Sequence, residues 1–220
     1  MLKVLGRRRP HAATTLSERA GSVSDGSINP SVAYASGSFC SLRSQREILA
    51  AGTLSHPHLV GAHDARWIRG RLVLVLEHVE GIDVSRLLAE IGPLPIDLAC
   101  RIARQTASAL DYLHRRGLVH RDVKPANLLL SHGLDSEAVV KLVDLGLICP
   151  TGTQGEELCG TPDYMPPERG HSPDAIDIRG DLYSLGCVLY ELLTGRVPFP
   201  GGTWTNKLLR HRLEVPTPII

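Results

Sequence analysis

The chain has 220 residues, of which 43% are hydrophobic and 21% charged. This is the composition of an ordinary globular protein, and the length allows one large domain or two small ones with real cores. The formal net charge of +1 gives no overall attraction to nucleic acid or to an acidic membrane, and the longest strictly apolar run, residues 72–76, is too short to cross a bilayer. The five cysteines are odd in number and far apart, which excludes a disulfide framework and favours a reducing compartment, the cytoplasm.

Residues 1–40 are rich in Ser, Ala, Gly and Arg, and they predict a poorly ordered or degenerate segment in which Leu2, Val4 and Leu5 favour a short strand. From residue 41 onward, apolar periodicity predicts regular elements. These are a helix from Leu42 to just before His56-Pro57, strands at 60–68 and 71–79, helices at 83–91 and 95–116, a strand at 139–143, and helices at 181–194 and 203–212.

The helix at 181–194 is strongly apolar and is followed by Gly195, an expected helix-ending residue. Its spacing predicts five residues that face inward, namely Leu182, Leu185, Val188, Leu189 and Leu192.

Residues 120–127 read His-Arg-Asp-Val-Lys-Pro-Ala-Asn and combine groups suited to phosphoryl transfer. Moving a phosphoryl group onto a hydroxyl requires the hydroxyl to be oriented and the phosphate charge to be neutralised. Asp122 is the candidate that orients the hydroxyl and accepts its proton. Lys124 would point the same way in an extended loop and steady the phosphate. Arg121 is then available for a negative group elsewhere.

Two further oxygens suit magnesium, a hard cation that prefers oxygen ligands. They are the amide oxygen of Asn127 and the carboxylate of Asp144, where Asp144-Leu145-Gly146 follows a predicted strand. Gly146 is expected to allow the sharp turn that leaves the carboxylate at the strand end. Taken alone, an Asp-Leu-Gly string is usually a turn and an Asn usually a solvated cap, but the ordered set of motifs favours a shared site.

The string at 120–127, Asp144-Leu145-Gly146 and Pro166-Pro167-Glu168 together resemble the protein kinase family. Lys124 and Gly160-Thr161 resemble the corresponding residues of the Ser/Thr branch of this family. The same holds for residues 181–199, DLYSLGCVLYELLTGRVPF, which are typical of bacterial members. The resemblance covers about residues 42–218. It implies a two-lobed α+β fold with an incomplete N-lobe at 41–79 and a truncated helical C-lobe at 83–220.

The resemblance assigns roles to residues of the expected C-lobe. Asp122 would be the catalytic base, Lys124 would hold the γ-phosphate, Asn127 and Asp144 would bind Mg²⁺, and Thr161 would contact Asp122 and Lys124 and help to select Ser/Thr substrates. A phosphate on Thr151 or Thr153 would pair with Arg121, although ordinary loop threonines are the simpler interpretation of either residue alone. Structural roles would fall to His120, Leu145, Gly146, Glu168 and Asp181, with a plain helix cap as the alternative for Asp181.

The resemblance also outlines an ATP site. Leu76 would be the gatekeeper, the backbone of Glu77 and Val79 would bind adenine, and Leu129 would be the floor of the pocket. Asp83 would reach the ribose, with a helix cap as the equal alternative. Glu47 would be the helix glutamate that pairs with an N-lobe lysine, with a solvated helix charge as its alternative.

The chain departs from the family in its N-lobe. It has no G-x-G-x-x-G-x-V loop, and the nearest match to V-A-I-K is Val32-Ala33-Tyr34-Ala35, with alanine in place of lysine. No lysine occurs between residues 4 and 123, so Glu47 is expected to lack its partner. At the other end the chain stops at Ile220, before the helices that normally pair with Glu168.

The sequence thus predicts a Ser/Thr protein kinase that uses ATP and Mg²⁺ on protein substrates, with no nucleic-acid partner. Three explanations fit its departures: a kinase fragment, a pseudokinase that binds nucleotide or protein with little catalysis, or an unrecognised phosphate cover within residues 1–40. A small-molecule kinase of related fold is a further alternative, which Gly160-Thr161-Pro162 and Pro166-Pro167-Glu168 disfavour.

Overall fold

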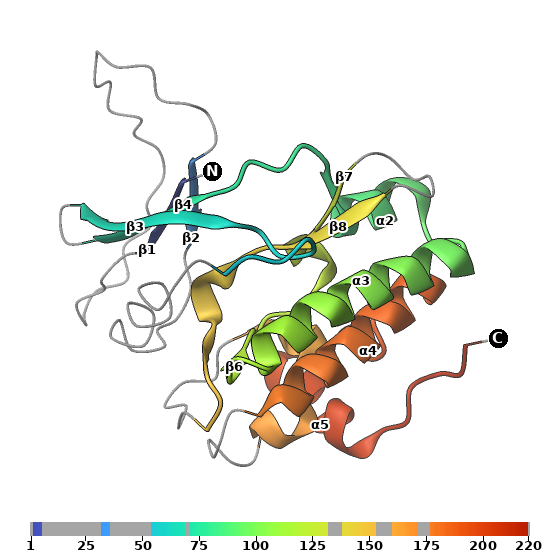
Figure 1. The fold of residues 1–220 in the computed structure, drawn as a ribbon. Coiled ribbons are helices and arrows are strands. Elements are labelled where there is room, and N and C mark those ends of the chain that lie inside the picture. Colours follow the sequence, from blue (N-terminus) through green and yellow to red (C-terminus); the bar gives the residue numbers. More distant parts are fainter. Residues whose placement is uncertain are drawn as a thin grey trace, which may run out of the picture.

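The computed structural model describes residues 2–5, 32–35, 54–68, 71–131, 138–152, 160–170 and 177–219. Within these residues a β-sheet lies on one side of the molecule and a helical part on the other, and the chain passes between them after strand β4 (Figure 1). The expected two-lobed α+β architecture is therefore confirmed. Glu47 and Thr153 lie outside the described residues, as does the predicted helix from Leu42.

The sheet contains β1 (Leu2–Leu5), β2 (Val32–Ala35), β3 (Ala62–Ile68) and β4 (Arg71–Leu76) in the order β2-β1-β4-β3. β1 runs antiparallel to β4 and parallel to β2, which lies at the edge. The alternating apolar and β-branched residues of β4 suit a strand that has a neighbour on each side. The predicted strand at 71–79 is too long, because β4 ends at Leu76, although the Glu77 amide still donates to Gly61 O (2.8 Å) next to the last β3–β4 pair.

Two small sheets shape the region where the lobes meet. One has the order β5-β7-β8, from β5 (Ile82–Asp83), β7 (Leu128–Ser131) and β8 (Val139–Leu142). The other pairs β6 (Leu118–Val119) with β9 (Cys149–Pro150). Since β7 follows the 120–127 loop and β8 precedes Asp144, the β7–β8 pairing brings the two predicted halves of the site together.

The helical part contains α2 (Val84–Ile91), α3 (Ile96–His114), α4 (Ile178–Thr194) and α5 (Trp204–Leu213). Among the described residues, four short 3₁₀ turns lie between α3 and α4 in the sequence. They are η1 (Pro125–Asn127), η2 (Leu145–Leu147), η3 (Pro162–Tyr164) and η4 (Pro167–Gly170). α4 begins three residues earlier than predicted, because the Asp177 side chain caps the Arg179 amide (2.8 Å). The plain-cap interpretation of Asp181 is therefore wrong.

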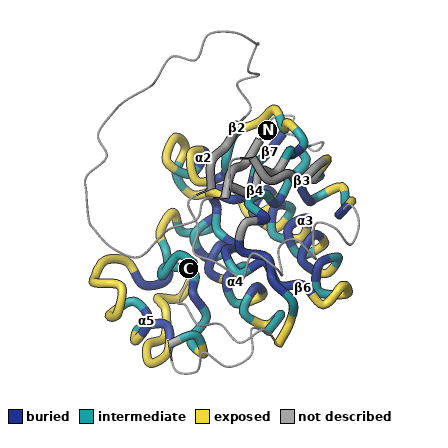
Figure 2. Tube along the Cα trace, turned by 90° about the vertical axis from the view of Figure 1, so that its left-hand side faces the viewer, coloured by how far each residue is buried: buried dark blue, intermediate teal, exposed yellow. Residues whose placement is uncertain are grey.

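The core lies between α3, α4 and the β7–β8 ladder, where the tube in Figure 2 is mostly dark blue. Leu110 and Leu113 of α3 and Leu192 of α4 are fully buried there, each contributing roughly 1.5–3 kcal/mol by leaving water. The inward prediction for Leu182 is wrong, since that side chain is 51% exposed. Its neighbour Asp181 takes the buried position in that turn of α4.

Residues 54–61 attach the sheet side of the molecule to β8. Leu59 forms a parallel bridge with Leu142, the Val60 amide donates to Leu142 O and the Leu142 amide donates to His58 O, both at 2.9 Å. Leu54, Leu59 and Val60 are buried in the main core. The strand that leads to Asp144 is therefore fixed from both lobes.

Candidate active site

The start of the 120–127 loop is hydrogen-bonded to Asp181 of α4. The carboxylate of Asp181, only 1% exposed, accepts from the backbone amides of His120 and Arg121 (both 2.8 Å) and contacts His114 Nε2 (2.9 Å). Arg121 has a left-handed backbone, with φ of 73°, a conformation that costs roughly 1–2 kcal/mol in an L-residue. The charge-assisted hydrogen bonds to Asp181 offset this cost and aim the next residue, Asp122, out of the loop.

Asp122, Lys124 and Thr161 form a closed set of polar contacts. Lys124 Nζ lies 2.6 Å from Asp122 Oδ2 and donates to Thr161 Oγ1 (2.9 Å), which in turn donates to Asp122 Oδ1 (3.0 Å). Asp122 is buried, whereas the Lys124 side chain is 24% exposed. The structure thus brings together the three groups to which the resemblance gave a shared role, namely the Asp122 carboxylate, the Lys124 ammonium and the Thr161 hydroxyl.

Asn127 joins this set to the strand that leads to Asp144. Its Nδ2 donates to Asp122 O (2.7 Å) and to Asp122 Oδ2 (3.0 Å), so the amide oxygen is the atom left to act as a ligand. The Val143 amide donates to Asn127 O (2.9 Å), which places Asp144 next to Asn127. Two oxygen donors fit a magnesium ion that also keeps water and substrate phosphates as ligands.

The turn at Asp144 differs from the expectation for Gly146. Asp144 itself has the left-handed backbone, with φ of 63°, and Gly146 lies inside the η2 turn that follows. Aspartate tolerates this conformation better than most residues. Two neighbours of the site are deeply buried: His120, whose Nε2 contacts Val143 O (3.0 Å), and Leu145 in the main core.

The predicted adenine region lies where β4 ends. Leu76 is buried, and Glu77 follows it with its carboxylate paired to Lys141. Leu129 of β7 lies opposite Asp83 on one side and Lys141 on the other. Asp83 Oδ1 accepts from the Arg86 amide (2.8 Å) and caps α2, which is the alternative that the sequence left open for it. A ribose contact would have to use its other oxygen.

Two of the predicted regulatory residues, Arg121 and Thr151, lie next to β9. Arg121 Nη1 contacts Cys149 Sγ (3.7 Å) in β9, and the exposed Thr151 follows β9 with its amide donating to Gly117 O (2.7 Å). Arg121 therefore reaches the strand that leads to Thr151. Glu168, in η4, is exposed.

A small pocket opens next to Asp122 and Thr161. Tyr164, Met165 and Pro166 form one of its walls. Tyr164 is fixed by α4, because its hydroxyl donates to Glu191 (2.7 Å) and its carbonyl accepts from Ser184 (2.7 Å).

Sequence reasoning overlooked Lys3. It took Val32–Ala35 as the strand in which a lysine was missing, but that strand is β2 at the sheet edge. The strand directly beside β4 is β1, in which Lys3 lies in register with Leu74. The signal was present in Leu2-Lys3-Val4-Leu5, a lysine among apolar strand residues, but Lys3 was not considered as the N-lobe cation.

Comparison with known proteins agrees with this geometry. The protein kinase domain family matches residues 36–217, and the chain belongs to that family. It is 37% identical over 186 residues to the serine/threonine-protein kinase PknB of Mycobacterium leprae and 37% identical over 187 residues to PknB of Mycobacterium tuberculosis, covering 80% of this chain in each case. Serine/threonine-protein kinase pkn3 of Myxococcus xanthus is 35% identical over 185 residues, again 80% of this chain.

The chain spans 29% of the length of the two PknB relatives and 34% of pkn3. Among the described residues, no helix has the length and apolarity needed to cross a membrane.

Proposed function

We propose that this chain catalyses transfer of the γ-phosphate of ATP to serine or threonine hydroxyls of proteins. The observation that carries the proposal is the closed set of Asp122, Lys124 and Thr161 (2.6 to 3.0 Å). Asp122 is placed to accept the proton of the substrate hydroxyl, and Lys124 supplies positive charge where the phosphate would arrive. Similarity to bacterial serine/threonine-protein kinases supports the same assignment.

The proposal includes Mg²⁺ and a nucleotide. Asn127 Oδ1 and the Asp144 carboxylate would hold the metal, which supplies charge neutralisation for the phosphates when bound. Glu77 and Val79 would contact adenine through their backbones, above Leu129. A reducing compartment such as the cytoplasm fits Cys100, Cys149 and Cys187, which form no disulfide among the described residues.

Lys3 is the cation that we propose for the nucleotide site, because it lies in the strand next to β4. A cation in the strand next to β4 would act on the α- and β-phosphates, the role for which residues 4–123 contain no lysine. Arg121 and Thr151 would form a phosphorylation-dependent contact across β9. Thr161, through its contacts with Asp122 and Lys124, would favour Ser/Thr acceptors.

The test is transfer of radiolabelled phosphate from ATP to a general protein substrate, with the wild-type chain and Asp122→Asn compared at equal concentration. We expect incorporation by the wild type and at least a hundredfold less by the variant, whose amide cannot accept the proton. If both bind nucleotide and both transfer at the same background rate, the chain is a nucleotide-binding pseudokinase and the proposal is overturned.

A further inference from the structure

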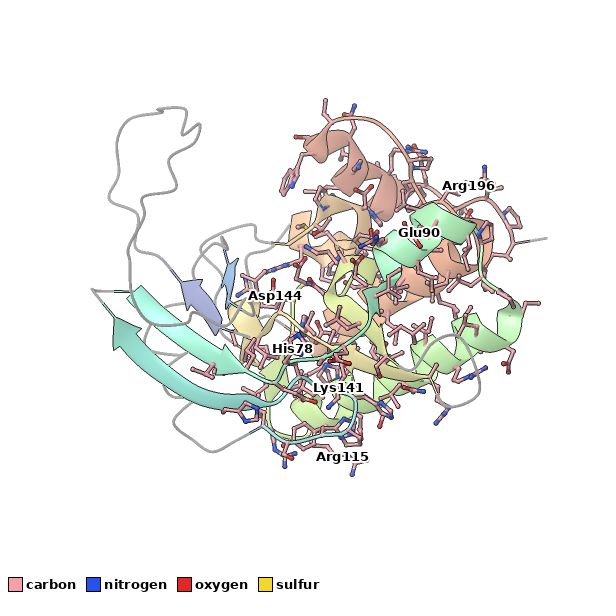
Figure 3. All side chains as sticks on the ribbon, turned by 90° about the horizontal axis from the view of Figure 1, so that it is seen from above. His78, Glu90, Arg115, Lys141, Asp144 and Arg196 are labelled. Atoms are coloured by element: carbon pink, nitrogen blue, oxygen red, sulfur yellow. The ribbon has the colours of Figure 1, made fainter. Side chains whose placement is uncertain are left out.

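Lys141 forms an ion pair that has no part in the catalytic set. Its Nζ lies 2.9 Å from Oε1 and 3.0 Å from Oε2 of Glu77, so it bridges both carboxylate oxygens. Figure 3 labels Lys141, His78, which is the residue after Glu77, and Asp144 in the middle of the view. The Lys141 side chain is 19% exposed and that of Glu77 is 32% exposed, which removes part of the screening that weakens surface pairs.

Lys141 is placed by the β7–β8 ladder. Its neighbours Val140 and Leu142 are buried, and its partner across the ladder is Leu129, the predicted floor of the adenine pocket. Paired residues of neighbouring strands point to the same face of a sheet. Lys141 and Leu129 therefore share the face of the ladder that is turned away from the main core. Lys141 also lies three residues before Asp144 in the sequence.

Glu77 is held by a second partner as well. Its amide donates to Gly61 O (2.8 Å), and its Oε2 accepts from the Gly61 amide (3.0 Å). Partial burial by itself would raise the pKa of Glu77, but the hydrogen bonds from Lys141 and Gly61 outweigh it and hold the pKa below its usual value. The carboxylate is thus ionised at neutral pH, with donors on two sides.

We infer that Lys141 is a positioning residue for the nucleotide base. By holding the Glu77 side chain, it fixes the backbone from Glu77 to Val79 and ties it to β8, the strand that leads to Asp144. This inference rests on the proposed function, in which that backbone contacts adenine. Loss of Lys141 would leave the Glu77 carboxylate with the donor that the Gly61 amide supplies and would loosen the adenine contacts, while Asp122, Lys124 and Thr161 keep their geometry.

The experiment measures binding of adenosine and of Mg²⁺–ADP by calorimetry to the whole chain and to Lys141→Met. Because a hydrogen bond between charged groups is involved, we expect the Kd to rise about five- to tenfold for the variant. The rise should be equal for the two ligands, since the weakened contact is to the base and not to the phosphates. In phosphate transfer the KM for ATP should rise while kcat stays near the wild-type value, and Lys141→Arg should restore most of the affinity.

Lys207→Met is the matched control, because Lys207 also forms an ion pair, but one between α5 and Asp163 of η3 (2.7 Å to Oδ2). It should leave the Kd for adenosine unchanged. Glu77→Gln removes the charge yet keeps an oxygen for the Gly61 amide, and it serves as the second route if Lys141→Met does not fold. The effects of Glu77→Gln and Lys141→Met should not add in the double variant.

The outcomes separate the two claims. Absence of adenosine binding by the wild-type chain overturns the proposed function itself. Wild-type binding that is unchanged in Lys141→Met or Glu77→Gln overturns the positioning role alone, and so does an equal loss in Lys207→Met. A loss confined to Mg²⁺–ADP would move the effect of Lys141 to the phosphates and would equally contradict the inference.

Discussion

Thr161 donates a hydrogen bond to Oδ1 of Asp122 (3.0 Å), although the two residues are 39 positions apart in the chain. The same hydroxyl accepts from Lys124 Nζ (2.9 Å), so it links the carboxylate to the cation through a second path besides their direct contact. Thr161 immediately precedes η3, whose Tyr164 is hydrogen-bonded to α4. The Thr161 hydroxyl therefore connects the segment that contains η3 with the 120–127 loop.

This link makes Thr161→Val an informative change, because valine keeps the shape of threonine and loses the hydroxyl. A hydrogen bond to a charged group contributes about 1.5–3 kcal/mol, so loss of the link is expected to lower kcat for phosphate transfer about ten- to a hundredfold. Thr161→Ser retains the hydroxyl and should stay within a few-fold of wild type. Steady-state kinetics at saturating ATP measure both, and equal rates for the two variants would show that the hydroxyl has no role.

Asp181 is expected to be a large contributor to stability. It is buried and accepts hydrogen bonds from the backbone of His120 and Arg121, which Asp181→Ala would leave buried without their partner. We expect a loss of about 3 kcal/mol in the free energy of unfolding, measured by urea denaturation.

The matched control for this change lies on the same helix. Asp177 is an exposed cap whose side chain accepts from the Arg179 amide (2.8 Å), and Asp177→Ala should cost only about 1 kcal/mol. Equal costs for the two alanine variants would mean that the hydrogen bonds beneath the catalytic loop are not important for folding.

The catalytic half of the site could be predicted from the sequence because its residues lie within short, ordered strings. Asp122, Lys124 and Asn127 occupy one loop, so their meeting required only that the loop fold back on itself. The position of Asp144 followed in the same way from the strand before it, whereas its backbone conformation did not. The choice of Asp144 over Gly146 for the left-handed residue depends on how β8 enters η2, which local pattern does not encode.

The N-lobe was harder to predict, because strand order depends on contacts between distant segments. The sequence favours a strand at Leu2–Leu5 and gives no strand signal at Val32–Ala35, and only pairing with β4 distinguishes the inner strand from the edge strand. The Lys141–Glu77 pair was missed for a similar reason, since its partners are 64 residues apart and meet only when β8 packs beside the end of β4. The exposure of Leu182 shows the limit of helical periodicity, because the buried Asp181 takes the inward position.

His56 and His58 are expected to make the stability of the folded chain depend on pH. His56 Nδ1 accepts from the His58 amide (3.2 Å), and His58 Nδ1 contacts Val140 O (3.1 Å) in β8. Burial lowers the pKa of both rings below 6.5, and the charge of His58 further lowers that of His56. Below pH 6.5 the unfolded chain therefore binds protons that the folded chain does not, and stability falls until the pH reaches the folded-state pKa values.

The expected result is a thermal midpoint that decreases between pH 7.5 and pH 5.5. His56→Asn keeps an acceptor for the His58 amide and removes one titrating ring, so it should make this decrease smaller. His211, whose pKa is also lowered by burial, will leave a residual slope in the variant. Midpoints that change by the same amount with pH in wild type and His56→Asn would rule out the contribution of this ring.

Lys3 gives the last prediction, which concerns the N-lobe cation. It lies in β1, beside β4, and is the cation proposed to act on the phosphates, whereas the proposed adenine contacts depend on the backbone from Glu77 to Val79. Lys3→Met should thus lower kcat for phosphate transfer about a hundredfold, the typical cost of losing one charge-stabilising group, and should leave adenosine affinity unchanged. Arg115→Met, which removes an exposed cation (76% exposed) at the end of α3, should retain the wild-type kcat. Transfer by Lys3→Met at the rate of Arg115→Met would show that phosphate binding depends on another group, and β1 would then serve only to complete the sheet.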